Sequence, residues 1–136
     1  MTFVYKFKVR FSDTDTYGII HHSSFFIYFE EARYSFSKKV LKIFDSDTFN
    51  EFKFPVLRAE CNYRSPLFYD LKDYEVKVDL QLFQANRILF KYTINKSGDS
   101  KILATGKTVH AIVENERLCL SIPERLEEAI KIAGIF

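Results

Sequence analysis

The fold is decided by the stretch Phe11-Ser-Asp-Thr-Asp-Thr-Tyr-Gly-Ile-Ile-His-His-Ser-Ser-Phe25. It separates a segment that alternates like a β-strand from one with the period of a helix. Two carboxylates, a glycine and two histidines fall within ten residues of this junction. A strand-to-helix junction can place a base beside a helix N-terminus, where unpaired N–H groups favour negative charge. The stretch is therefore the first candidate for chemistry.

The segments on either side of this junction differ in hydrophobic period. Before it, apolar side chains alternate with basic ones, which predicts a half-buried strand. The apolar row is Phe3, Tyr5, Phe7, Val9 and Phe11. After it, apolar residues recur at steps of three and four, on one helical face. That face is Phe25, Phe29, Ala32, Phe36, Val40 and Ile43. We expect a helix of about five to six turns, capped by Ser23 or Ser24 and ending near Phe44 and Asp45.

The rest of the chain reads mainly as strands. We expect them at residues 54–63, 74–82, 88–94 and 102–113, with a short one at 118–120, a hairpin turn at 97–99 and a short helix after Pro123. This order predicts an α+β fold in which an antiparallel sheet of about five strands wraps around one long helix. Exposed strand edges are a liability unless another chain pairs with them, so we also expect a dimer.

Composition narrows the function classes. The 136 residues suit a single domain, residues 1–136, and a net charge of +2 with both signs dispersed argues against a nucleic-acid binder. We find no membrane span and no signal peptide in the sequence. Cys61 and Cys119 lack metal-type spacing and read as free thiols in a reducing cytoplasm. The 15 Phe and 8 Tyr fit an apolar ligand pocket, a subunit interface or a densely packed core.

Several segments carry a family resemblance that covers essentially the whole chain. They are residues 13–25, Tyr28-Phe-Glu-Glu-Ala-Arg33, Tyr63-Arg-Ser-Pro-Leu-Phe-Tyr-Asp70, Leu103-Ala-Thr-Gly106 and Ile122-Pro123. Together they resemble the hotdog-fold acyl-CoA thioesterases, and most of all the YbgC-type branch of the 4-hydroxybenzoyl-CoA thioesterase family. The resemblance implies hydrolysis of an acyl-CoA or acyl-carrier thioester by a homodimer or homotetramer. It implies no metal and no bound cofactor, since CoA is part of the substrate.

The resemblance also implies unequal roles within the opening stretch. Asp15 matches the catalytic aspartate, as general base or as nucleophile; an acid that only shapes an Asx-turn is the alternative. The backbone N–H of His22 would stabilise the oxyanion and its imidazole would orient the carbonyl or the water; a packed or capping histidine is the alternative. Gly18 would supply a backbone conformation or a close approach that other residues resist, and an ordinary turn glycine is compatible with that role. Asp13, a loop-shaping or surface acid, and His21 are neighbours.

Further residues are candidates for substrate contact or architecture. The substrate-binding set is Gly18, Ile20, His21, Phe25, Arg64 and Arg87. Arg58 and Lys107 join the two arginines as candidates for the CoA phosphates, against the alternative of solvated strand-face charges. Glu30 and Arg33 are expected to form a buried ion pair that fixes helix and dimer geometry.

Two other functions fit the same fold. A hotdog hydratase or dehydratase would aim an acid and a histidine at the α and β carbons of an acyl-CoA, and the hydratase-type spacing is not found here. A non-catalytic acyl-CoA-binding protein would not need Asp15. Because fold alone does not decide function, both alternatives stay open at the sequence level.

Overall fold

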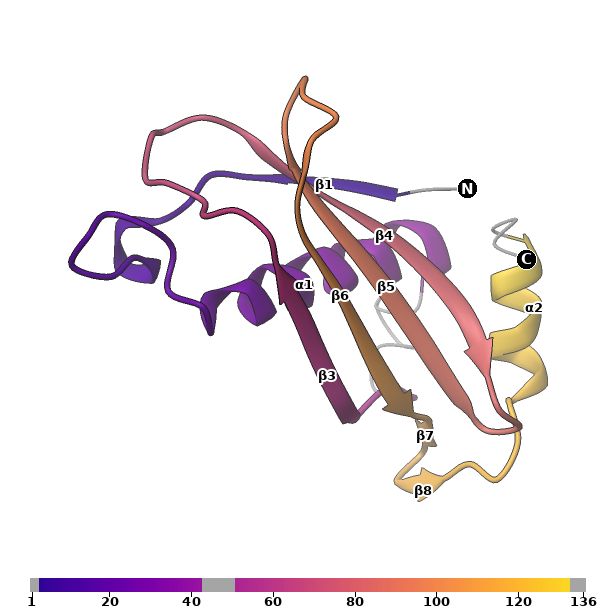
Figure 1. Ribbon diagram of the computed structural model, residues 1–136. Helices are drawn as coiled ribbons and strands as arrows, with labels where there is room; N and C mark the ends of the chain where they lie inside the picture. Colours follow the sequence, from indigo (N-terminus) through magenta and orange to yellow (C-terminus); the bar gives the residue numbers. More distant parts are fainter. Residues whose placement is uncertain (1–2, 43–50, 133–136) are drawn as a thin grey trace.

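The computed structural model describes residues 3–42 and 51–132. Five antiparallel strands form the main sheet in the order β1-β4-β5-β6-β3. They are β1 (Phe3–Phe7), β4 (Tyr74–Phe83), β5 (Arg87–Lys96), β6 (Ile102–Ala111) and β3 (Val56–Tyr63). The helix α1 (Ser24–Phe36) lies along one face of this sheet (Figure 1). The predicted α+β architecture, with one long helix against an antiparallel sheet of five strands, is confirmed.

Shorter elements complete the chain. A small sheet joins β2 (Phe52–Lys53), β7 (Val113–Glu114) and β8 (Arg117–Leu118), and α2 (Glu124–Ile132) follows it. The predicted strand at 54–63 corresponds to β3, which begins at Val56, and β2 lies before the predicted range. The predicted strand at 102–113 is divided between two sheets, because β6 ends at Ala111 and β7 begins at Val113 and pairs with β2 and β8. The β4–β5 ladder runs without a break from Tyr74 opposite Lys96 to Phe83 opposite Arg87.

The first strand is shorter than its alternation suggested. β1 ends at Phe7, although Val9 stays buried beyond it. Phe11 was expected to point inward, but its side chain is 76% exposed. The chain leaves the sheet after Phe7 and turns through the 3-10 segment η1 (Phe11–Asp13), so strand alternation no longer sets the direction of its side chains.

The long helix follows its predicted face but not its predicted ends. The inward residues Phe25, Phe29, Ala32 and Phe36 are buried as expected. The helix continues through the π-helical turn η2 (Ser37–Leu41) and stops at Lys42, whose φ of 57° is left-handed. It thus ends before Phe44, and Ile43, Phe44, Asp45 and Ala133 lie outside the described residues.

The prediction that Ser23 or Ser24 caps the N-terminus of α1 with its side chain is wrong. Ser23 has helical backbone angles and its side chain makes no capping hydrogen bond. The Ser24 hydroxyl instead donates to the backbone oxygen of Asp13 at 3.2 Å. Both hydroxyls thus serve the preceding loop, which leaves the N–H groups at the start of α1 without a side-chain acceptor from these residues.

Close approach of helix and sheet depends on one glycine. The Phe29 ring stacks on the Tyr92 ring at a centroid distance of 4.4 Å. This stack lies over Gly106 of β6, where an added Cβ would come within 2.3 Å of the Phe29 ring. Only a residue without a side chain fits there, since Phe29 is fully buried and cannot move aside.

Gly106→Ala is expected to lower the free energy of unfolding by roughly 1–3 kcal/mol, as overpacking of a filled core does. Urea unfolding followed by circular dichroism measures this. The matched variant is Phe29→Leu combined with Gly106→Ala, because the shorter side chain makes room for the methyl group. If the two substitutions cost the sum of their separate effects, the proposed clash is wrong.

A chain of hydrogen bonds crosses the core between helix and sheet. The Arg33 guanidinium donates to the Tyr92 hydroxyl at 3.0 Å, and that hydroxyl lies 2.6 Å from the Thr108 hydroxyl. Thr108 is in turn 2.8 Å from Nε2 of His110, whose Nδ1 lies 2.9 Å from the backbone oxygen of Phe54. Burial lowers the pKa of His110 to about 4, so this fully buried imidazole is neutral at neutral pH.

The expected ion pair between Glu30 and Arg33 is therefore wrong. Arg33 is committed to Tyr92, and Glu30 is exposed to solvent. The neighbouring Glu31 makes the ion pair instead, accepting two hydrogen bonds from the Arg10 guanidinium at 2.7 and 3.2 Å. Glu31 faces Arg10 because the loop after β1 returns along that side of α1.

Candidate active site

The loop that carries Asp15 folds back on itself. Thr14 pairs with Ile20 in an antiparallel bridge, and the Asp15 N–H donates to the Ile19 oxygen at 2.8 Å. Gly18 turns the chain with a φ of +77°. A Cβ there would meet nothing within 4 Å, so Gly18 is required for its left-handed backbone and not for close approach. Of the two properties expected of Gly18, the structure thus shows the unusual backbone conformation.

A second loop braces this one from the side. The Ile20 N–H donates to the Leu67 oxygen at 2.8 Å, and the Tyr69 N–H donates to the Gly18 oxygen at 3.2 Å. The segment after β3 therefore continues the pairing begun by Thr14 and Ile20. Residues 14–20 sit in a small irregular sheet and are not a free loop.

One carboxylate oxygen of Asp15 is occupied and the other is not. Oδ1 accepts the Tyr17 N–H at 2.8 Å, which is the Asx-turn that formed the alternative reading of this residue. Within the described residues, Oδ2 has no hydrogen-bond partner. Asp15 is partly exposed. The turn fixes the carboxylate while leaving one oxygen available to water or substrate.

Of the backbone N–H groups of residues 20–22, which precede α1, one has no hydrogen-bond acceptor among the described residues. The Ile20 N–H is used by Leu67, and the His21 N–H donates to the Asp13 oxygen at 2.8 Å. Among the described residues the His22 N–H has no partner. It precedes α1 by two residues, where the helix dipole favours an anion. Of these three amides, the His22 N–H is therefore the one left free to donate to a bound group.

The two imidazoles lie side by side on the surface. The rings of His21 and His22 are 4.3 Å apart, and Nδ1 of His21 is 2.8 Å from the Ser23 hydroxyl. Both residues are exposed. His21 is therefore held by its own turn, whereas the His22 ring makes no recorded hydrogen bond in the described part of the chain.

A groove of about 290 Å³ opens beside His22. Its lining residues are Ile20, His22, Phe25, Tyr63, Arg64, Ser65 and Pro66. Four predicted site residues meet there, while Asp15, Gly18 and His21 lie on the adjoining loop and do not line it. Tyr63 was not predicted as a site residue, although it opens one of the segments that carried the family resemblance.

Tyr63 closes one wall of this groove. Its ring meets the Phe25 ring edge-on at 4.9 Å, and its hydroxyl donates to the His22 oxygen at 3.0 Å. Strand β3 ends at Tyr63. The end of an outer strand of the sheet thus fixes the peptide that follows His22.

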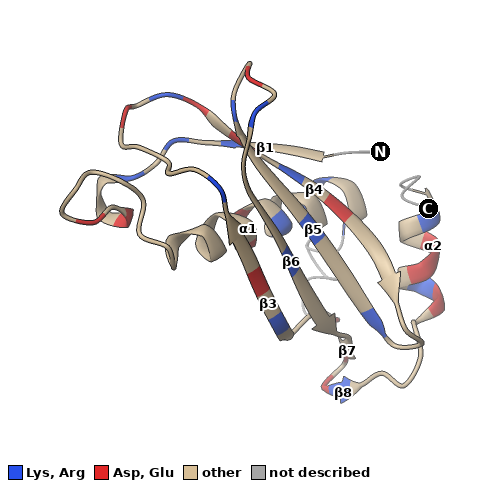
Figure 2. Ribbon diagram, in the orientation of Figure 1, with Lys and Arg blue, Asp and Glu red and all other residues tan. Residues whose placement is uncertain are grey.

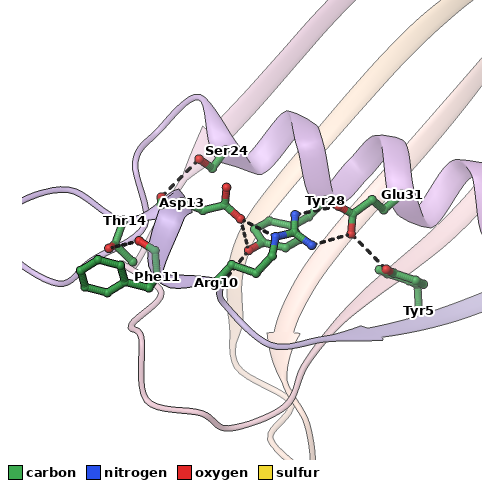
Figure 3. A network of polar contacts seen from close by, with 8 residues as sticks. All are labelled: Tyr5, Arg10, Phe11, Asp13, Thr14, Ser24, Tyr28 and Glu31. Carbon is green, nitrogen blue, oxygen red and sulfur yellow. Dashed lines mark hydrogen bonds and ion pairs between the residues drawn. The ribbon is translucent and has the colours of Figure 1, made fainter.

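Asp13 shapes the loop from below. Its carboxylate accepts the Tyr28 hydroxyl at 2.6 Å and Nε of Arg10 at 3.0 Å, and only 11% of its side chain is exposed (Figure 3). Burial and the hydrogen bond to Asp13 raise the pKa of Tyr28. The hydrogen bond to Glu31 raises the pKa of Arg10. Of the two roles expected for Asp13, the structure shows the loop-shaping one.

Comparison with known families decides what this geometry belongs to. A sequence model described as the thioesterase-like superfamily matches residues 9–130. The chain belongs to this superfamily. The match includes the Asp15 loop, α1 and every strand of the main sheet except β1. The family predicted from the sequence is thereby confirmed.

Similar proteins of this thioesterase-like superfamily span nearly the same length. The chain is 36% identical over 133 residues to a putative esterase of Aquifex aeolicus, covering 96% of this chain and 99% of that one. It is 28% identical over 144 residues to a protein of Prochlorococcus marinus named 1,4-dihydroxy-2-naphthoyl-CoA hydrolase, covering 97% and 91%.

Solved structures agree with the hotdog fold expected for the superfamily. A hypothetical protein from Thermus thermophilus superimposes with a TM-score of 0.83 at 29% identity, over 96% of this chain and 98% of that one. A 1,4-dihydroxy-2-naphthoyl-CoA thioesterase from Synechocystis gives a TM-score of 0.78 over 96% of each chain. At 23% identity, the latter shows the shared fold alone.

The cations of this thioesterase-like chain do not gather at the groove. Figure 2 shows acidic and basic residues mixed over the main sheet. Arg64 lines the groove, but Arg87 starts β5 at the opposite end of the sheet. On β6, the partners of Tyr63 and Arg87 are seven positions apart, roughly 23 Å at ~3.3 Å per residue. Within one chain, the structure does not bring Arg87 to the groove.

The other two cation candidates border a separate hollow on the sheet. Arg58 and Lys107 line it together with Glu60, and Arg58 lies 3.4 Å from the Glu60 carboxylate. Three of four sheet-face cations are thus away from His22.

In the described part of the superfamily domain, no group of three His, Cys, Asp or Glu residues could hold a metal. No described helix is long and apolar enough to cross a membrane.

Proposed function

We propose that this chain, acting through residues 1–136 as one hotdog domain, hydrolyses the thioester of an acyl-CoA or an acyl-carrier protein to a free acid and a thiol. The observation that carries the proposal is the unpaired His22 amide beside the groove. Both preceding amides are already bonded, so this one is left to meet a carbonyl oxygen. Membership of the thioesterase-like superfamily and relatives named as CoA hydrolases support the same reaction.

The roles follow from which atoms are free. The His22 N–H and the start of α1 stabilise the oxyanion as it forms. The free Oδ2 of Asp15 takes a proton from water, the water oxygen bonds to the carbonyl carbon, and the C–S bond breaks as the thiolate receives that proton. In the covalent route, Oδ2 bonds to the carbonyl carbon, the C–S bond breaks and the thiolate leaves; water then hydrolyses the mixed anhydride, which releases the acid and restores the carboxylate, and one proton of that water goes to the thiolate. The His22 imidazole orients the carbonyl or the water in either route.

The remaining site residues would serve the substrate. Ile20 and Phe25 give the groove its apolar wall for the acyl group, with His21 beside it and Gly18 setting the loop. Arg64 lies where the polar arm of the substrate leaves the groove. Arg87 would contribute only from a second copy of the chain, because the length of β6 separates it from His22.

Assembly into a homodimer is part of the proposal. Among residues 3–42 and 51–132, strand β3 pairs only with β6, so its other edge carries backbone groups that no described strand pairs with. Val56, Leu57 and Tyr63 on this strand are 49%, 51% and 47% exposed. Pairing of two β3 edges would continue the sheet across a two-fold axis. Light scattering would distinguish this dimer from a homotetramer. We also propose that the protein belongs to the YbgC-type branch. We propose a cytoplasmic location, where Cys61 and Cys119 stay free thiols.

The test is a panel of acyl-CoAs, from acetyl to palmitoyl and including benzoyl and naphthoyl thioesters, with thiol release followed by a chromogenic disulfide. Release of free CoA from some members is expected. Release from none of them would overturn the proposal. Loss of enoyl-CoA absorbance without thiol would favour the hydratase alternative. Thermal stabilisation by acyl-CoA without any turnover would favour the binding protein.

A second hollow extends the groove toward further cations. It shares Ser65 and Pro66 with the groove and adds Lys96 and Lys101. Lys96 is held by Asp70 at 2.9 Å, whereas Lys101 makes no side-chain contact within the described residues. The acyl group would occupy the part beside His22, and the phosphate-bearing arm would pass over Ser65 and Pro66 toward Lys101.

Arg64→Gln and Lys101→Gln are each expected to raise KM for acyl-CoA about two- to tenfold, as for a net loss of about 0.5–1.5 kcal/mol per charged contact. The same acyl group on N-acetylcysteamine, which has no phosphates, should show no such change. Lys77→Gln, an exposed lysine of β4, is the matched control. Equal effects on both substrates would contradict this placement of the phosphates.

A further inference from the structure

Two buried tyrosines contact the ring of Phe7 at the end of β1. The Tyr28 and Tyr74 rings stack on the Phe7 ring at centroid distances of 4.1 and 5.8 Å. Tyr28 is 0% exposed and Tyr74 is 1% exposed. Neither residue lines the groove beside His22, although Tyr74 borders the second hollow. Their rings therefore belong to the core, and only their hydroxyls reach toward the loops above.

The Tyr28 hydroxyl is joined to the loop that carries Asp15. It accepts the Arg10 N–H at 3.1 Å and donates to the Asp13 carboxylate at 2.6 Å (Figure 3). The Asp13 backbone oxygen then accepts the His21 N–H at 2.8 Å. Asp13 thus connects a hydroxyl of α1 to both parts of the proposed site. It lies two positions before Asp15, and its backbone oxygen holds the N–H of His21, the residue before His22.

The Tyr74 hydroxyl makes the same pair of contacts with the second loop. It accepts the Phe68 N–H at 3.1 Å and donates to the Asp70 carboxylate at 3.3 Å. Lys96 donates to the same oxygen of that carboxylate at 2.9 Å. Residues 67–69 are the segment that pairs with residues 18–20 of the Asp15 loop. Tyr74 therefore holds residues 67–69, and these residues pair with the Asp15 loop that Tyr28 holds.

We propose that Tyr28 and Tyr74 are paired positioning residues, which hold Asp15 and the His22 amide at a fixed separation by anchoring both sides of the Asp15 loop to one stack of rings. The inference rests on the proposed function, since it assigns these hydroxyls to the geometry of the same reaction. Packing alone would be met by phenylalanine at both positions. The hydroxyls add only hydrogen bonds, and all of these go to the two loops.

Tyr28→Phe and Tyr74→Phe isolate the hydroxyls, because each leaves the ring stack intact. The matched control is Tyr92→Phe, which removes an equally buried hydroxyl bonded to Arg33 and Thr108, away from both loops. We expect the first two to lower kcat roughly ten- to hundredfold, as small misplacements of reacting groups do, with KM unchanged. Tyr92→Phe should lose thermal stability to a similar degree and keep kcat.

A second measurement does not depend on turnover. Amide hydrogen exchange at Ile20 and His21, whose N–H groups bond to Leu67 and Asp13, should accelerate in Tyr28→Phe and Tyr74→Phe but not in Tyr92→Phe. If the wild type releases no thiol, the proposed function fails and exchange alone still tests the anchoring. If exchange or kcat responds equally in all three variants, the positioning role is overturned.

Discussion

Asp15→Asn is expected to lower kcat for thioester hydrolysis by roughly 10²–10⁴-fold, the usual contribution of a general base. An amide oxygen neither takes a proton from water nor attacks a carbonyl, so both proposed routes lose their first step. The fold should be unaffected, because the Asn side chain can still accept the Tyr17 N–H that holds Asp15 in its turn. KM should stay near the wild-type value.

Steady-state thiol release from the best acyl-CoA of the panel measures this effect. Asp73→Asn is the matched control, since it removes the charge of an exposed acid whose partner is Lys8. Its kcat should equal that of the wild type. A kcat for Asp15→Asn that also equals the wild-type value would remove Asp15 from the mechanism while leaving the fold assignment intact.

Acid is expected to destabilise the fold by about 3 kcal/mol through His110 alone. Burial, with the Arg33 cation adding to it, lowers the pKa of His110 from 6.5 to about 4 in the folded state. As pH falls below 6.5, the unfolded chain takes up the proton first and is stabilised. The folded state follows only near pH 4, so stability is intact above pH 6.5 and declines between these values by about 1.4 kcal/mol per unit.

The hydrogen bonds around His110 explain why the folded state resists the proton. A carbonyl cannot donate, so Nδ1–H must donate to Phe54 and the neutral ring must accept at Nε2 from the Thr108 hydroxyl. Thr108 then accepts from Tyr92, which accepts from Arg33. A proton on Nε2 would face the hydroxyl hydrogen of Thr108, so two donors would meet. To accept the new N–H, the Thr108 hydroxyl would have to turn round, and the Tyr92 hydroxyl with it.

Urea unfolding at a series of pH values, compared between wild type and His110→Gln, measures the contribution. Carboxylates that lose their partners in acid, such as Asp70 with its pKa lowered by Lys96, affect both proteins equally. The difference between the two curves should therefore isolate the imidazole. A difference that stays constant between pH 6.5 and 4 would contradict the burial of a neutral histidine.

The strands and the helix face could be read from periodicity because they depend on neighbours in sequence. β4 and β5 fill the predicted ranges, and α1 buries the predicted row. Phe11 continues the same alternation yet is exposed, because alternation does not show where a strand leaves its sheet. The helical segment that continues α1 through η2 stops at Lys42 because of a left-handed backbone, which a lysine residue does not predict.

The site was predictable only where the family resemblance named single residues. Asp15 and His22 were proposed that way, whereas Tyr28 and Tyr74 looked like ordinary core aromatics. Glu30 was preferred to Glu31 because helical spacing shows the distance to Arg33 but not the return of Arg10 in space. His110 left a readable signal, since it shares the inward side of its strand with Ala104, Gly106 and Thr108.

Because no described strand pairs with the outer edge of β3, the proposed activity would depend on protein concentration. The strand ends at Tyr63, which forms a wall of the groove and holds the peptide after His22. Whatever binds along this edge therefore also touches the wall of the site. If a second chain does so, specific activity and resistance to unfolding will fall together on dilution, with one midpoint set by the dissociation constant of the pair.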